Sequence, residues 1–87
     1  MEIKKELIKR DIAGDPVLVP VGKTVMENNG LFILNELGAF IWDMLPELGS
    51  EEEAVSAVLR EYDIDEDTAR SDTAEFFEKL RGFGIID

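Results

Sequence analysis

Residues 30–42 read Gly30-Leu31-Phe32-Ile33-Leu34-Asn35-Glu36-Leu37-Gly38-Ala39-Phe40-Ile41-Trp42, an apolar run that passes directly into a helical pattern. The four apolar residues at 31–34 do not alternate with polar ones, so both faces of this strand should be covered, one by the core and the other by a helix or a partner. Asn35 is a suitable N-cap, because its side-chain oxygen can accept a backbone N–H from the first helical turn. The stretch therefore predicts a strand joined without a linker to a helix over about 36–45.

Two residues inside this predicted helix indicate how it packs. Gly38 costs about 1 kcal/mol relative to alanine in a helix interior, which predicts a close backbone approach at that position. Trp42 lies on the apolar side of the helical pattern and is expected in the core or at its edge.

The residues before this stretch predict a meander of short strands over about 6–34. The first strand is Leu7–Ile12, and residues 13–16 form the turn that closes it. The second is Val17–Val21, where Pro20 has no N–H for a ladder and indicates an edge or a bulge. Residues 24–28 are an extra arm or a continuation of the second strand. Asn29-Gly30 is a hairpin turn, since both residue types tolerate positive φ.

The residues after the first helix predict two more helices. Ser50 and Glu53 have the spacing of a capping box, which starts a helix over about 51–61. Asp65 starts the last helix, over about 66–83, and Gly84 ends it. The expected fold is α+β and winged-helix-like: one domain over residues 1–87, with an N-terminal three-stranded antiparallel sheet followed by a three-helix bundle.

The last helix carries two apolar stripes. The stripe expected to face inward contains Ala69, Thr73, Phe76, Leu80 and Phe83. A second stripe contains Arg70, Ala74, Phe77 and Arg81. An aromatic ring between two arginines is compatible with a groove that binds an apolar anchor and a carboxylate. The alternative is core packing for the phenylalanine and pairing of the arginines with glutamates of the same helix, Glu66 or Glu78.

The composition argues against an enzyme. The chain has no cysteine and no histidine, so it lacks thiolates, the commonest zinc ligands and the usual general base. We expect no catalytic residue, no metal and no cofactor. The N-terminus lacks the apolar core of a signal peptide, and no apolar run approaches the roughly 18 residues of a membrane helix. A soluble cytoplasmic protein is expected.

The net charge limits the classes of partner that the protein can bind. The net charge is −11, and most of it comes from residues 47–87, which contain thirteen acidic and four basic residues. Because nucleic acids and anionic membranes are bound through lysine and arginine, neither is an expected partner. A partner with positive charge is compatible, although an acidic surface that only confers solubility is the simpler explanation.

At the level of residues the chain resembles the pyrroloquinoline quinone biosynthesis protein D (PqqD) family. The similar stretches are 12–15, 17–24, 29–31, 34–42 and the closing Leu80-Arg81-Gly82-Phe83-Gly84-Ile85-Ile86. The resemblance implies a non-catalytic recognition element that binds the leader of a ribosomally made precursor peptide and delivers it to a modifying enzyme, often of the radical SAM/SPASM type. In that family the leader adds as a strand beside the third strand and lies between that strand and the third helix.

Carried onto this chain, the resemblance and the stripes together give one predicted peptide-binding set. Its members are Leu31, Phe32, Ile33, Leu34, Arg70, Thr73, Ala74, Phe77 and Arg81. A one-residue slip exchanges the two faces of a strand, so the sequence leaves open which of residues 31–34 meet the peptide.

Two other functions remain open at this stage. The same strand edge can pair with a second copy, which makes a structural or dimerisation module, so the protein is a monomer or a homodimer. The winged-helix layout also occurs in nucleic-acid binders, but such a protein needs a basic third helix, and residues 65–81 hold six acidic residues against three basic ones.

Overall fold

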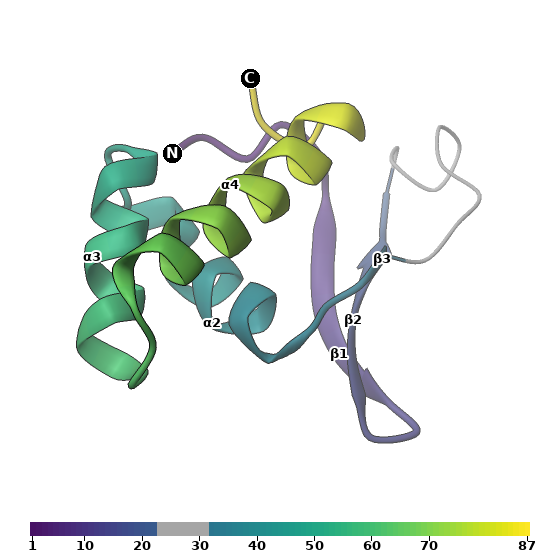
Figure 1. The fold of residues 1–87 in the computed structure, drawn as a ribbon. Helices are drawn as coiled ribbons and strands as arrows, with labels where there is room; N and C mark the ends of the chain where they lie inside the picture. The colour runs from purple at the N-terminus through teal and green to yellow at the C-terminus, as the bar shows by residue number, and fades with distance from the viewer. Residues whose placement is uncertain (23–31) are drawn as a thin grey trace.

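The computed structural model describes residues 1–22 and 32–87, which form a three-stranded sheet beside a group of helices (Figure 1). The elements are β1 (Leu7–Ile12), β2 (Asp15–Pro20), β3 (Phe32–Ile33), α2 (Glu36–Met44), the 3-10 helix η1 (Leu45–Glu47), α3 (Glu51–Glu61) and α4 (Glu66–Gly82). The sheet is antiparallel and its strand order is β1-β2-β3. The predicted fold class is confirmed.

The first hairpin is tighter than the sequence predicts. Ala13 and Gly14 have φ values of 54° and 88°, so both central residues of the turn are left-handed. Turns of this kind match the twist of paired strands, and pairing therefore extends to Ile12 opposite Asp15. The second strand consequently begins at residue 15, where the sequence had indicated a longer turn.

The second strand occupies the centre of the sheet. Pro20 is its last residue and lies opposite Leu7 of β1, whereas the pairing with β3 involves Val17 and Leu18. The missing N–H therefore falls outside the described β2–β3 ladder, and no bulge is needed to accommodate it. The predicted arm at 24–28 and the predicted turn at 29–30 lie outside the described residues.

Each α-helix among the described residues begins at a side-chain cap. The side-chain oxygens of Asn35, Ser50 and Asp65 accept the backbone N–H of the residue three positions later, at 2.7, 3.3 and 2.7 Å. Such caps satisfy donors that the first turn leaves without partners. They fix the helix starts at the predicted positions. At the other end of α4, Gly84 has φ of 71°, which ends the helix as expected.

The core lies mainly among the helices, and Leu18 of β2 joins it from the sheet. Its largest fully buried side chains are Phe77, Leu18, Ile41, Leu45, Leu80, Val58 and Thr73. The two ends of the chain lie close together, since the Lys4 backbone N–H donates to the Ile85 carbonyl at 2.6 Å (Figure 1). In the described part of the chain, no helix combines the length and apolar character needed to cross a membrane.

Candidate functional site

The edge of β3 presents open backbone groups. The Leu34 N–H donates to the Pro16 carbonyl of β2 at 2.8 Å, and Phe32 lies opposite Leu18. Because hydrogen-bonding directions alternate along an antiparallel strand, residues 32 and 34 point their backbone groups at β2. The N–H and C=O of Ile33 then point away from the sheet. No residue of the described ranges pairs with this side of β3.

The side chains of the same strand alternate between the two faces of the sheet. Leu34 is buried and Phe32 is half-buried against the helices, whereas 67% of Ile33 is exposed. The side chains of residues 32 and 34 therefore face the helices, and that of residue 33 faces away from them.

A cleft of about 250 Å³ lies between this strand and α4. Its lining residues are Phe32, Ile33, Leu34, Asn35, Asp72, Phe76 and Lys79. The Phe32 ring meets the Phe76 ring edge-on, with centroids 6.3 Å apart, and approaches the Phe83 ring at 5.1 Å. The cleft thus combines an aromatic wall with an exposed strand edge, and a carboxylate and an ammonium group lie on its helical side.

Gly38 of α2 allows this aromatic wall to form. A Cβ atom at Gly38 would lie 3.1 Å from Cε1 of Phe76 and 3.1 Å from Oδ1 of Asn35. Both distances are shorter than ordinary carbon contacts, so the phenylalanine ring occupies the space that a side chain would fill. The predicted close approach at Gly38 is confirmed, and the group from another helix that approaches it is the Phe76 ring of α4.

The arginines of the second α4 stripe lie on a different side of the helix. Arg70 binds both carboxylate oxygens of Glu52 in α3 at 2.7 and 2.6 Å, and Glu66 of its own helix at 2.9 Å. Arg81 pairs with Glu51 of α3. These bonds, first of all the one from Glu52, raise the pKa of Arg70, and Arg70 lowers the pKa of the Glu52 carboxyl. The arginines therefore tie α4 to α3, and neither lines the cleft.

The other predicted members of the α4 set are also absent from the cleft lining. Phe77 is fully buried in the core, and Thr73 is fully buried with a hydroxyl that has no hydrogen-bond partner among the described residues. Ala74 is exposed but does not line the cleft. Of the predicted strand residues, 32–34 line the cleft and Leu31 lies outside the described residues.

The cleft-facing side of α4 has the same spacing as the predicted stripe but is displaced by two residues. Residues 72, 76 and 79 line the cleft, and Phe83, at the end of the helix, contacts Phe32. A displacement of two residues is a rotation of about 200° around an α-helix, so this side is nearly opposite the predicted one. Phe83 is 53% exposed, which corrects the expectation that it packs inward. The sequence signal for this face was present, because Phe76 also lies between charged residues at helical spacing.

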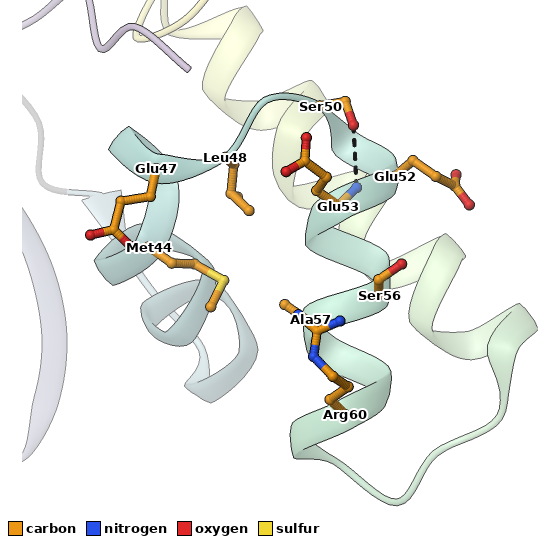
Figure 2. Close-up of a pocket in the computed structure, with 9 residues that line it drawn as sticks. All are labelled: Met44, Glu47, Leu48, Ser50, Glu52, Glu53, Ser56, Ala57 and Arg60. Carbon is orange, nitrogen blue, oxygen red and sulfur yellow. Dashed lines mark hydrogen bonds between the residues drawn. The ribbon is translucent and has the colours of Figure 1, made fainter.

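A second, wider cleft lies between η1 and α3 (Figure 2). Its volume is about 560 Å³, and it is lined by Met44, Glu47, Leu48, Ser50, Glu52, Glu53, Ser56, Ala57 and Arg60. The Ser50 hydroxyl already caps α3 through Glu53, as the dashed line in Figure 2 shows. This cleft is built from helices and the turn between them and contains no strand edge, so it offers no backbone ladder to an extended chain. Within residues 1–22 and 32–87, no three acidic side chains gather as a metal site.

Comparison with known proteins identifies a structural neighbour and a family. A solved structure described as "TbiB1 in Complex with the TbiA(beta) Leader Peptide" superposes with a TM-score of 0.73 at 26% identity, and the match covers 100% of this chain and 95% of that one. No curated protein matches the sequence. The family model of coenzyme PQQ synthesis protein D matches residues 17–86. The chain therefore belongs to the PqqD family.

Proposed function

We propose that this protein binds the leader segment of a ribosomally synthesised precursor peptide as an added strand on β3 and holds it for a modifying enzyme. The observation that carries the proposal is the open edge of Ile33 above the aromatic cleft. The family membership and the leader-peptide complex of the structural neighbour support it. The protein acts as a non-catalytic module, and an enzyme of the radical SAM type carries out the modification.

Backbone pairing would supply one part of the binding energy. An added strand accepts the Ile33 N–H and donates to its C=O, and each such bond contributes about 0.5–1.5 kcal/mol net. Pairing of this kind fixes the path of the peptide but does not depend on its sequence. Selectivity must therefore come from the side chains that meet the cleft.

The cleft would supply this selectivity through apolar burial. Alternate side chains of the guest strand point towards α4, where Phe32 and Phe76 line the cleft and Phe83 packs against Phe32. Burying one leucine- or phenylalanine-sized side chain there contributes about 1.5–3 kcal/mol. Together with a few backbone bonds, and after the cost of ordering the peptide, this supports micromolar binding, which corresponds to about −8 kcal/mol.

The test separates the backbone from the side chain at position 33. Peptides are selected from a display library of random 12-residue segments, and their affinities are measured for the wild type, Ile33→Pro and the matched control Ile33→Val. Proline removes the N–H that points away from β2, and the lost bond of about 0.5–1.5 kcal/mol should weaken binding roughly two- to tenfold, while the valine variant should bind like the wild type. Circular dichroism checks that both variants fold. Equal binding by a folded proline variant would refute strand addition at this edge.

The same edge supports a second candidate function, pairing with another copy of this chain. A strand edge with unpaired backbone groups is a template for any extended segment, including β3 of a neighbour. Analytical ultracentrifugation with and without a selected peptide distinguishes the two functions. A dimer that the peptide dissociates assigns both activities to this edge, and a dimer that the peptide leaves intact places dimerisation elsewhere.

A further inference from the structure

The cleft beside β3 continues past the end of the strand. An adjoining cleft of about 260 Å³ is lined by Asn35, Glu36, Leu37, Tyr62, Ile64 and Asp72. Two of these residues, Asn35 and Asp72, also line the cleft beside β3. The two clefts therefore form one groove that runs from β3 across the start of α2 to the connection between α3 and α4.

The extension combines apolar walls with carboxylates. Leu37 and Tyr62 are half-buried and Ile64 is 36% exposed, so their side chains offer apolar surface to a guest. Glu36 and Asp72 are exposed, and neither makes a hydrogen bond or an ion pair within residues 1–22 and 32–87. Among the residues that the structure describes, no lysine or arginine lines the extension. Burial and the negative charges of the nearby Glu36 and Glu61 raise the pKa of the Tyr62 hydroxyl.

This combination fits one kind of side chain. Lysine and arginine carry an aliphatic stem that packs on apolar surface and a charged head that remains near water. Here the stem would lie against Leu37 and Ile64, and the head would lie near the carboxylates and the ring of Tyr62. An acidic side chain would be repelled at this place, and a short apolar one would leave both carboxylates without a partner.

The direction of α4 determines where in the peptide this side chain lies. Asp72 lies at the Asn35 end of the groove, while Phe83 lies beside Phe32 at the other end. A guest that pairs antiparallel to β3, the more stable arrangement per residue, runs with its N-terminal part towards Asn35. Its basic residue therefore precedes the apolar residue that enters the cleft, by roughly two to four positions given the rise of a strand.

We propose that the Asn35–Asp72 end of the groove is a subsite for a lysine or arginine of the bound peptide, placed N-terminal to its apolar anchor. The inference rests on the proposed function, because it takes the peptide to be held on β3. It adds a charge requirement and a chain direction to that function. Both arise from residues that make no contribution to backbone pairing.

The experiment uses the same display library of random 12-residue peptides with three forms of the full chain. The test form is Asp72→Asn with Glu36→Gln, which removes both carboxylates of the extension. The control is Asp67→Asn with Glu78→Gln, which removes the same charge from exposed positions of α4 outside both clefts. Each selected peptide is also made with its basic residue replaced by glutamine.

Peptides selected by the wild type should carry lysine or arginine before an apolar residue and should bind the test form roughly fivefold more weakly, the effect of one or two partly exposed ion pairs. The control form should bind like the wild type, and the glutamine peptides should not distinguish the three forms. Selection of apolar peptides without a basic residue, or equal loss in test and control forms, would overturn the subsite while leaving the proposed function intact. Failure to select any peptide whose binding is weakened by Ile33→Pro would instead refute the proposed function.

Discussion

Gly38→Ala tests the contact that shapes the cleft. Alanine is favoured over glycine by about 1 kcal/mol inside a helix, so an isolated helix would gain stability. In the folded protein the new Cβ would lie 3.1 Å from Phe76 Cε1 and 3.3 Å from its Cδ1. That ring has little room to retreat, because the rings of Phe32 and Phe77 flank it at 6.3 and 6.2 Å. Overpacking of this kind costs about 1–3 kcal/mol.

The net expectation for Gly38→Ala is a loss of about 1 kcal/mol in the free energy of unfolding. For a domain of this size that lowers the melting temperature by about 4–8 °C, measured by circular dichroism. Gly82→Ala is the matched control, since no described atom lies within 4 Å of a Cβ at that position, and it should leave stability unchanged or slightly raised. In a Phe76→Leu background the cost at Gly38 should shrink. A Gly38→Ala protein as stable as Gly82→Ala would refute the argument.

Two further predictions concern stability away from the strand edge. Thr73→Val replaces a buried hydroxyl that has no described hydrogen-bond partner with a methyl group of similar size. The free energy of unfolding from urea denaturation should rise by about 1 kcal/mol, and peptide binding should not change. A lower free energy of unfolding would mean that the hydroxyl has a hydrogen-bond partner. The pKa values of Asp65 and Glu52 are lowered from 3.8 and 4.5 by hydrogen bonds from Thr68 and Arg70. A carboxyl whose pKa is lowered in the folded state stabilises the fold above its unfolded pKa, and this stabilisation is lost as the pH falls through the folded pKa. The urea midpoint should therefore decrease when the pH is lowered below about 4, and it should decrease less steeply in Asp65→Asn. A midpoint unchanged between pH 6 and pH 3 would contradict this.

Local chemistry made much of this fold predictable. The three caps, at Asn35, Ser50 and Asp65, depend on a few consecutive residues, and each helix begins where its cap predicts. The strand at 32–33 was indicated by an apolar run of its own. The start of β2 was harder to predict from the sequence, because it depends on a positive φ at Ala13, a conformation that alanine rarely adopts.

The orientation of α4 was not predictable from its periodicity. Adjacent phenylalanines at 76 and 77 place apolar side chains on two stripes, and spacing alone does not say which stripe meets α3 and which meets β3. The pairing of Arg70 with Glu66 was among the alternatives, but its stronger partner, Glu52, lies 18 residues away on another helix. The position of Phe83 was missed for the same reason: its neighbour is Phe32, far away in the sequence.

Amide hydrogen exchange at Ile33 tests the central claim most directly. In the free protein its N–H points away from the sheet, whereas the Leu34 N–H is bonded to Pro16. Ile33 should therefore exchange fast in the free protein and slowly with a selected peptide bound, while Leu34 should be protected in both states. A bound peptide that leaves the exchange of Ile33 unchanged would contradict strand addition at β3.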